Sequence, residues 1–581
     1  MRIKPLFLSM VAGLAFIGCS NEEDITSGNN GGELSEPQFL TVNLVANQTN
    51  GSRGVRAGGD QTSGNPDATY EEGLEAENKV TTVRFYFFDA SGNPASVRND
   101  NGTHKNYLEW TNITEENNNM PNVEKILTAT LIIQSPKGDA APEQVVAVIN
   151  PTAPANEERS LTSLATVAHD YQQYTTSGSF VMSNSTYASD NVEKMAVSVK
   201  EKIHKTSGEA LNDPVQIYVE RTIAKVRLNS SLTPVAGQAN IFKTSTDGSQ
   251  KVNVDGVAKE IYVKFLGWNA TAVSDKSRLV KAINPGWKAE LFGSTSIPWN
   301  WTEYFRSFWA INANGVNYQY GAFVPGADDD EDNLFQAQAK KNFNKTDWVY
   351  VNENASDYTA SPSLSTGENP GTPTKVIIAA QLVDENGNPL EFVEYGSTRT
   401  TINGLKELFA NNCGLYKKET VTEDEVTKTK FVKITPDELT VKTATAVGEA
   451  GKDVPGRYKA YVQLATDEDS KWYASNNENA TAITAAVANK QLKSLGSAKV
   501  WKDGNTYYYF DINHLGNKIG VVRNHIYDAN ITKLTGLGTP VYDPEEIIYP
   551  EKPKDDNDTF IAAQINILSW RVVSNNVELN W

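Results

Sequence analysis

The residue types that most often carry chemistry in proteins are few and widely spaced in this chain. Two cysteines, Cys19 and Cys413, and five scattered histidines offer neither a disulfide framework nor the spaced ligands of a zinc site. The sequence has no phosphate-binding loop, dinucleotide glycine fingerprint, zinc-protease helix or serine nucleophile elbow. Nothing singles out one carboxylate pair for acid–base catalysis among 71 acidic residues. These observations disfavour an enzyme, and we predict a non-enzymatic protein with no metal and no other cofactor.

Cys19 is nevertheless a candidate for lipid attachment. Two basic residues precede an apolar run over 6–17, which is too short to cross a hydrocarbon core of about 30 Å and has the layout of a secretory signal. The run ends in the letters FIGC at 16–19, which resemble a bacterial lipobox. We therefore predict a signal peptide over 1–18 and a lipidated Cys19 that anchors the precursor in the outer membrane. An ordinary secreted protein with one free cysteine is the alternative.

Length and patterning predict an all-β protein with more than one domain. The 581 residues are about four times the usual single-domain length, and 39% of them are hydrophobic. The net charge of −18 argues against a nucleic-acid partner. Short alternating runs rich in Val, Ile, Tyr, Phe and Thr, bounded by Gly, Asn, Asp and Pro, are typical of β-sandwiches. The expected strands are 39–46, 80–89, 124–134, 144–150, 214–228, 259–269, 374–383, 457–465, 506–512 and 560–573.

Helical patterns are few. The expected helices are 161–168, 401–412 and 480–495. Leu405, Leu408 and Phe409 lie on one face of the second, and Cys413 continues that apolar face. Because no neighbouring base is visible, we interpret Cys413 as a buried, inert thiol and not as a nucleophile.

Three separated segments carry a family resemblance. The letters VERTIAKVRL at 219–228 resemble the V-E-R-x-x-A-K-V strand of Bacteroidetes fimbrillins, and VVRNHIY at 521–527 looks like their V-x-R-N-x-x-Y strand. The closing segments, ILSW at 567–570 and VEL at 577–579, are similar to those of Mfa-type major subunits. The chain thus resembles a FimA/Mfa-type fimbrillin, the major subunit of a type V pilus made as a lipoprotein precursor. The resemblance implies two transthyretin-like, Greek-key β-sandwich domains and a role in adhesion and biofilm formation.

The motif residues also have a plain structural interpretation. The apolar positions of the first motif suit a sheet core, and its cations could be solvated strand charges. In the second motif the polar residues could cap a strand and a turn. His525 is not interpreted as a catalyst, because no paired carboxylate or nucleophile is identifiable. The polar residues concerned are Arg221, Lys225, Arg227, Arg523, Asn524, His525 and Tyr527.

The first expected strand has features of a removable element. Leu40, Val42 and Leu44 alternate with polar residues, so one side should be buried in a sheet. The Gly- and Asn-rich stretch after it contains Arg53 and Arg56, and such an exposed loop suits a trypsin-like protease. Cleavage after Arg56 is favoured by its resemblance to the family's maturation site, and Arg53 remains open. Removal of the strand would leave a groove that accepts a strand from another molecule.

The C-terminal tail is the expected donor. A Pro- and acid-rich spacer over 542–558 precedes apolar residues that alternate with polar ones, with a slip in phase near Leu568. A plain terminal strand folded back on its own domain is the alternative. The predicted donor residues are Ile561, Ile565, Ile567, Leu568, Trp570, Val572 and Leu579.

Two other clusters deserve an interpretation. Aromatic residues gather at Trp287, Trp299, Trp301, Tyr304, Phe305, Phe308 and Trp309 and could stack on sugars, but core packing or inter-subunit contact is favoured. The acidic run 328–332 lacks the spaced ligands and glycine of a calcium loop, so a solvated loop is favoured.

Together these features predict a structural stalk subunit of a surface fimbrium, cleaved after an arginine and polymerised head to tail by donor-strand exchange. Its partners would be copies of itself, accessory tip and anchor subunits, an Arg-specific trypsin-like protease and, before maturation, the outer membrane. The alternative is a monomeric glycan-binding surface lipoprotein. The predicted segments are a signal peptide (1–18), a lipidated propeptide with the first strand (19–56), an N-terminal sandwich (57–229), a C-terminal sandwich (230–548), and a spacer with donor strands (549–581).

Overall fold

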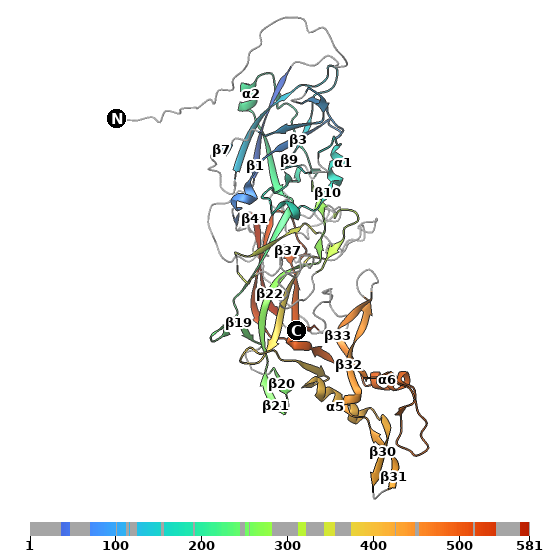
Figure 1. Cartoon of the computed structure of the whole chain (residues 1–581). Helices are drawn as coiled ribbons and strands as arrows, with labels where there is room; N and C mark the ends of the chain where they lie inside the picture. The colour runs from blue at the N-terminus through green and yellow to red at the C-terminus, as the bar shows by residue number, and fades with distance from the viewer. Residues whose placement is uncertain are drawn as a thin grey trace, which may run out of the picture.

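The computed structural model is elongated, with an N-terminal part, a central part and a module that projects to the side of the C-terminal half (Figure 1). The fold is built almost wholly from strands, which confirms the predicted all-β class. The described residues are 37–46, 70–71, 73–99, 102–111, 115–116, 125–152, 156–189, 192–244, 250–254, 256–281, 312–320, 342–344, 346–354, 373–423, 426–447, 453–514, 518–541 and 570–579.

The N-terminal part is one ten-stranded sheet around a single hydrophobic core. Its main path runs β6-β3-β9-β11-β16-β1-β8-β7, with β14 beside β9 and β15 beside β1. The strands are β1 (Gln38–Ala46), β3 (Val83–Phe88), β6 (Tyr107–Trp110), β7 (Glu115–Glu116), β8 (Lys125–Ile133), β9 (Gln144–Ile149), β11 (Met182–Asn184), β14 (Val197–Ser198), β15 (Ile203–His204) and β16 (Val215–Arg221).

The central part has two sheets that share a second core, which is the packing of a β-sandwich. One sheet has the order β2-β41-β39-β17-β26 and the other β18-β19-β22-β27-β36-β40. The strands are β2 (Tyr70–Glu71), β17 (Ile223–Ser230), β18 (Pro234–Val235), β19 (Gln238–Lys243), β22 (Tyr262–Thr271), β26 (Trp348–Asn352), β27 (Lys375–Val383), β36 (Asn505–Asp511), β39 (His525–Leu534), β40 (Thr539–Pro540) and β41 (Trp570–Leu579).

Two-stranded ladders extend these sheets, and short helices connect their strands. The ladders are β4 (Val97–Arg98) with β5 (His104–Lys105), β10 (Ala168–His169) with β24 (Ser277–Arg278), β12 (Tyr187–Ser189) with β13 (Val192–Lys194), β20 (Lys251–Val254) with β21 (Val257–Glu260), β23 (Val273–Ser274) with β25 (Tyr318–Gln319), and β37 (Asn513–His514) with β38 (Lys518–Ile519). The helices are α1 (Leu161–Thr166), α2 (Ser207–Asn212), η2 (Glu75–Asn78) and η3 (Gln172–Tyr174).

The chain passes from the N-terminal sheet to the central sheets at Thr222, between β16 and β17. The sequence predicts a single strand over 214–228, whereas the structure has two strands in different sheets. Thr222 is fully buried, and its backbone N–H and hydroxyl both donate to the carbonyl of Val181. Val181 directly precedes β11. The chain therefore changes from one sheet to the other at Thr222 without leaving the buried N–H or hydroxyl of this residue unpaired. The predicted domain limits, including the one at residue 229, stay predictions.

A third hydrophobic core lies in residues 391–500, which we call the inserted module. The chain leaves the central sheet after β27 and returns as β36, the strand paired with β27, so the module adds no strand to that sheet. Its hydrophobic core is distinct from the other two, and the module projects to the side of the N-terminal and central parts (Figure 1). Its elements are β28 (Phe392–Tyr395), β29 (Thr398–Thr400), α5 (Ile402–Asn412), β30 (Tyr416–Glu423), β31 (Val426–Lys433), η6 (Pro436–Glu438), β32 (Leu439–Val447), β33 (Asp453–Leu464), β34 (Trp472–Tyr473), α6 (Ala485–Ser494) and β35 (Lys499–Trp501), with η8 (Lys502–Gly504) beyond.

Helix α5 shows how local sequence determines an element of this module. The Thr401 hydroxyl accepts a hydrogen bond from the backbone N–H of Gly404 at 3.0 Å, which caps the helix N-terminus. Leu405 and Phe409 are buried in the module core, as the apolar face predicts. Cys413 ends the helix with 3% exposure, and burial raises the pKa of its thiol. These observations agree with the interpretation of Cys413 as a buried, inert thiol.

We predict that Leu405→Ala destabilises the inserted module by about 2–5 kcal/mol, because it removes a fully buried side chain from the third core. Leu408→Ala, on the same helix but only half-buried, is the matched control and should cost less. Denaturant unfolding followed by hydrogen exchange would check both. Protection should fall in the module and persist in the central sheets; equal losses in both regions would contradict a separate core.

Candidate functional site

Strand β1 occupies a slot inside the N-terminal sheet. All nine of its residues pair antiparallel with β8, and its other edge pairs with β15 at the start and, in parallel, with β16 from Val42 to Ala46. Leu40 and Val42 are fully buried and Leu44 is 1% exposed, as the alternation predicts. Thr41 on the opposite face is also buried, with its hydroxyl 3.1 Å from that of Thr130. Both edges and both faces of the strand are therefore covered.

The C-terminal strand β41 lies elsewhere, in the central part. It pairs in parallel with β39 from Arg571 to Leu579, and among the described residues its other edge pairs with the two residues of β2. The structure thus places 570–579 on the chain's own sheet, the arrangement that the folded-back alternative describes. Trp570, Val572 and Leu579 belong to this strand. The other predicted donor residues, Ile561, Ile565, Ile567 and Leu568, lie outside the described residues.

Where the N-terminal and central parts meet, the structure buries a cluster that we call the charged junction. Its cations and carboxylates come from both family motifs and from three other segments, and all are at most 3% exposed except Lys225 at 4%. The interpretation of Arg221, Lys225 and Arg227 as solvated charges is wrong, because each is buried against partners distant in sequence. The junction comprises Glu77, Glu220, Arg221, Lys225, Lys281, Glu353, Arg523 and Asn524.

One half of the junction is centred on Glu77, in η2. The Lys225 ammonium lies 2.6 Å from Glu77 Oε1, and the Tyr350 hydroxyl also donates to that oxygen. Burial alone would raise the pKa of Glu77, but Lys225, Tyr350 and Arg221 together hold it below its ordinary value. The Arg221 guanidinium donates to the Glu77 carbonyl at 3.1 Å and to Asn524 Oδ1 at 3.0 Å. The two family motifs are thereby in direct contact.

The other half is centred on Arg523, which is fully buried. Its Nε lies 2.6 Å from Glu353 Oε2, and its Nη1 donates to the Leu279 carbonyl at 2.8 Å. Nearby, Lys281 Nζ lies 3.2 Å from Glu220 Oε1. Burial lowers the pKa of Lys281, and the carboxylates Glu220 and Glu353 oppose that shift. Buried charges of this kind are tolerated only when they are paired.

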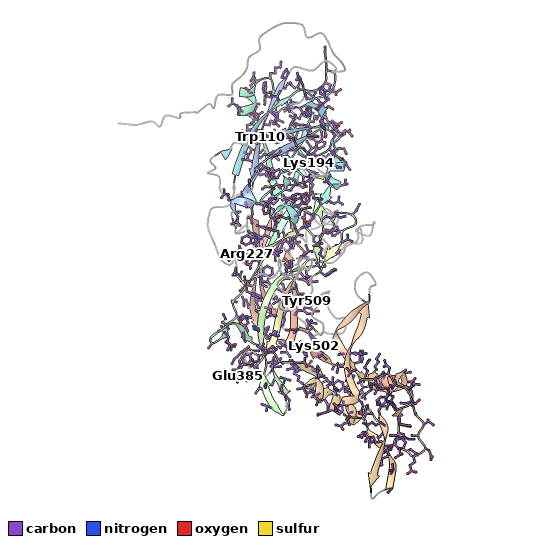
Figure 2. The ribbon with its side chains drawn as sticks, in the orientation of Figure 1. Trp110, Lys194, Arg227, Glu385, Lys502 and Tyr509 are labelled. Atoms are coloured by element: carbon purple, nitrogen blue, oxygen red, sulfur yellow. The ribbon has the colours of Figure 1, made fainter. Side chains whose placement is uncertain are left out.

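The remaining motif residues pack along the same strands. Arg227 pairs with Asp528 at 3.1 Å, tying β17 to β39 about halfway along the molecule (Figure 2). His525 Nδ1 lies 2.7 Å from the Arg523 carbonyl, and the Tyr527 hydroxyl accepts from the Val522 N–H at 2.7 Å. These contacts are structural, in line with the interpretation of the second motif as a strand and turn cap.

Sequence reasoning missed the partners of the motif cations. Glu77 and Glu353 pair with Lys225 and Arg523 across 148 and 170 residues, and Lys281 pairs with the motif carboxylate Glu220; all three stand in segments with no motif of their own. The available signal for these partners was a charged residue within an otherwise apolar strand, because such a charge needs a counterion if it is buried.

Several predicted features fall outside the described residues: Cys19, Arg53, Arg56, the aromatic cluster at 287–309 and the acidic run at 328–332. Within the described ranges, no group of three or more His, Cys, Asp or Glu side chains is arranged to hold a metal ion. No helix in that same part of the chain combines the length and the apolar character needed to span a membrane.

Comparisons with known proteins bear on the class of protein. Residues 499–576 match the family described as major fimbrial subunit protein type IV, fimbrillin, C-terminal. This segment contains β36, β39, the second motif and most of β41. The match confirms the fimbrillin resemblance predicted from the sequence, and it supports a fimbrial subunit at the cell surface. Over these residues, the chain is similar to the C-terminal part of fimbrillins.

Solved structures that resemble the chain include fimbrial proteins of low sequence identity. A fimbrilin (FimA) from Porphyromonas gingivalis is 13% identical, with 93% of this chain and 97% of that chain covered and a TM-score of 0.32. The tip fimbrial protein Mfa3 of the same species is 12% identical over 68% and 100% of the two chains, with a TM-score of 0.24. A fimbrial assembly protein from Parabacteroides distasonis is 10% identical over 69% and 97%, with a TM-score of 0.27. A search of curated proteins finds no match.

We predict that Glu77→Gln destabilises the protein at neutral pH by about 3–5 kcal/mol, because it leaves the Lys225 ammonium buried without its anion. Since the folded-state pKa of Glu77 lies below its ordinary 4.5, the stabilisation is present above pH 4.5 and lost as the pH falls through the folded pKa. Urea unfolding of wild type and variant should therefore converge in acid.

Glu75→Gln is the control for this measurement, because Glu75 lies in the same short helix but is exposed. It should change stability by no more than about 0.5 kcal/mol. Equal stabilities for the two variants at neutral pH would show that the buried pair does not hold the junction together.

Proposed function

We propose that the chain is a structural stalk subunit of a surface fimbrium, exported as a lipoprotein, cut after an arginine and polymerised by strand exchange. The observation that carries this proposal is the position of β1, which is paired along both edges and whose residues Leu40, Thr41, Val42 and Leu44 are buried. The candidate cleavage sites, Arg56 and Arg53, follow that strand within ten residues of its end. One cut therefore separates a central strand of the sheet from the rest of the chain.

Loss of β1 would leave the N-terminal sheet split between β8 and β16. The backbone N–H and C=O groups that now face β1 would be unpaired, beside an apolar floor that Leu40, Val42 and Leu44 now cover. Buried unpaired backbone groups are costly, and an open sheet edge is a template for another strand. An extended segment with alternating apolar residues is the chemical complement of this groove.

The free energy that strand exchange can supply decides how much of the tail must take part. Replacing the three β1 side chains would stabilise the complex by about 5–9 kcal/mol, as an upper value. Association alone costs about 4–15 kcal/mol. A single short strand is therefore marginal, and we propose that residues 560–581 engage the neighbour as a whole, with Ile561, Ile565 and Ile567 filling the apolar positions.

In this proposal the partners are copies of the same chain, accessory tip and anchor subunits, an Arg-specific trypsin-like protease, and the outer membrane through Cys19 before maturation. The fibre would support adhesion and biofilm formation, with no enzymatic step and no cofactor. The monomeric glycan-binding lipoprotein remains the second candidate, and the placement of β41 on its own chain is the observation that favours it.

We predict that brief trypsin treatment of the purified precursor yields a ladder of oligomers on an unheated denaturing gel. Ile565→Asp should abolish the ladder, because it places a charge at an apolar position of the groove. Asn566→Asp, which faces the other way in the alternating pattern, is the matched control and should leave the ladder intact. An unchanged monomer that binds polysaccharide would favour the second candidate.

We further predict that a subunit truncated after Asp558 forms no ladder once cleaved, yet captures a synthetic peptide of residues 559–581 in the emptied slot. The peptide should raise the thermal midpoint of the cleaved subunit more than that of the uncleaved one, because the truncation empties the edge of β39 in both forms but β1 still fills the groove in the uncleaved one. Equal stabilisation of both forms would contradict the proposed slot. Surface fibres that persist on cells producing the truncated chain would contradict the donor role.

A further inference from the structure

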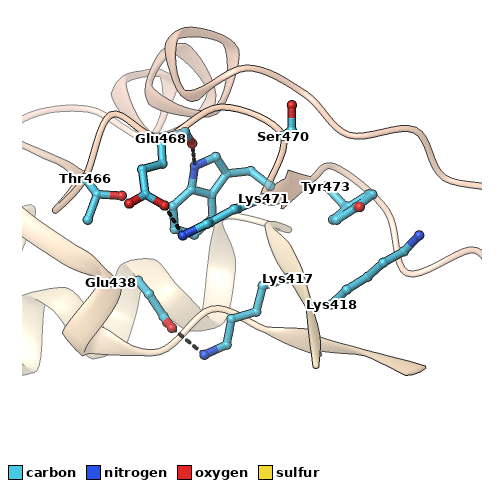
Figure 3. A pocket seen from close by; sticks show the side chains of 9 residues that line it. Lys417, Lys418, Glu438, Thr466, Glu468, Ser470, Lys471 and Tyr473 are labelled. Atoms are coloured by element: carbon cyan, nitrogen blue, oxygen red, sulfur yellow. Dashed lines mark hydrogen bonds and ion pairs between the residues drawn. The ribbon is translucent and has the colours of Figure 1, made fainter. Parts of the chain in front are cut away.

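The inserted module contains a pocket that the polymerisation scheme does not use. It measures about 440 Å³, within the range of sites for small ligands. Its walls come from the start of β30, from Glu438 in η6 and from the loop that leads into β34 (Figure 3). The lining residues are Lys417, Lys418, Glu438, Thr466, Glu468, Ser470, Lys471, Trp472 and Tyr473.

The walls of this pocket are held in place by contacts on several sides. Strand β34 pairs with β30, and the Trp472 indole N–H donates to the Glu468 carbonyl at 2.8 Å, which closes the loop. The Lys417 ammonium is held between Glu438 and Glu419, and hydrogen bonds with both carboxylates raise its pKa. A pocket that is already formed binds a ligand without first ordering its own side chains.

Two cations of the pocket are available to a ligand. Lys418 Nζ lies 4.9 Å from the centroid of the Tyr473 ring and 5.1 Å from that of Phe431, with no carboxylate in ion-pair range among the described side chains. Lys471 pairs with Glu468, but their side chains are 63% and 57% exposed, so water screens the pair. A ligand anion can replace such a partner at little cost.

The charge of the module separates it from the rest of the chain. Residues 391–500 hold 15 Lys and Arg against 15 Asp and Glu, so the whole net charge of −18 lies outside them. The pocket itself is lined by three lysines and two glutamates. The module as a whole is therefore neutral, and the excess of lysines at the pocket favours an anion there.

From this geometry we propose that the pocket binds an acidic saccharide whose carboxylate or sulfate meets Lys418 or Lys471, the ammonium groups at its two opposite sides (Figure 3). Its volume suits one or two sugar units, and the buried Trp472 and Tyr473 give it a rigid aromatic back wall. Ser470, also in the lining, has a left-handed backbone at φ 69°, a strained geometry that clusters at binding sites. The proposal deepens the adhesive role proposed above and rests on it for the biological setting alone.

The test uses the uncleaved, full-length precursor, so that binding is measured without polymerisation. Titrations with 3′-sialyllactose, a sulfated heparin disaccharide and neutral lactose, followed by ligand-observed NMR, distinguish a carboxylate from a sulfate. We expect one or both acidic sugars to bind, more weakly at high salt, and lactose not to bind. No binding of either acidic sugar up to about 10 mM, or equal binding of lactose, would overturn the proposal.

Variants locate the site. Lys418→Gln combined with Lys471→Gln should weaken binding at least tenfold, and Thr466→Trp should block the opening without a change in charge. Lys490→Gln, an exposed lysine on α6 away from the pocket, is the matched control and should alter affinity less than twofold. Equal loss in the control, or a glutamate-rich peptide that binds as tightly as the sugar, would reject this site.

The double variant should still form the trypsin ladder, so failure of the ladder and failure of the pocket remain distinguishable.

Discussion

The structure depends on one continuous stretch of backbone, β16 followed by β17, that belongs to two sheets. Strand β16 forms one wall of the slot that holds β1, and β17 pairs with β39, the strand on which β41 lies. Only Thr222 separates the two strands. The segment that would accept a foreign strand is thus directly connected to the sheet that carries the chain's own terminal strand. Any pull along a fibre would have to pass through this connection.

The charged junction is what fixes the angle of that connection. Arg221, just before the change of sheet, reaches both η2 and Asn524, while Lys225, just after it, reaches Glu77. A buried ion pair tolerates little displacement, because the cost of desolvating the two charges soon exceeds their mutual attraction when they move apart. Apolar side chains at these positions would restrict the geometry less. The same restriction makes the loss of one partner costly, as expected for Glu77→Gln.

The elements that sequence analysis predicted well are those whose signals are local. Strand β1 was visible from its alternation, and α5 from its apolar face. The charged junction was not visible, because whether Lys225 is solvated or buried depends on Glu77, 148 residues earlier. Nor was the third core, since a pattern of strands and helices does not reveal which ones pack together. The family motifs contain five of the junction's residues, Glu220, Arg221, Lys225, Arg523 and Asn524, but they do not indicate that the two motifs touch.

The unequal surroundings of the two terminal strands give strand exchange a direction. In its own sheet, β41 has a full ladder on one edge, with β39, and two residues of β2 on the other. In the slot now filled by β1, a strand is paired along both edges, by β8 and by β15 and β16. A tail that moved from the first place to the second would therefore exchange one ladder for two, at a net gain of about 0.5–1.5 kcal/mol for each added hydrogen bond. As long as β1 remains covalently attached, it holds the slot at high effective concentration and the exchange cannot begin. In the proposed scheme, cleavage would remove that advantage, so a single proteolytic step would be sufficient to convert the subunit into an acceptor.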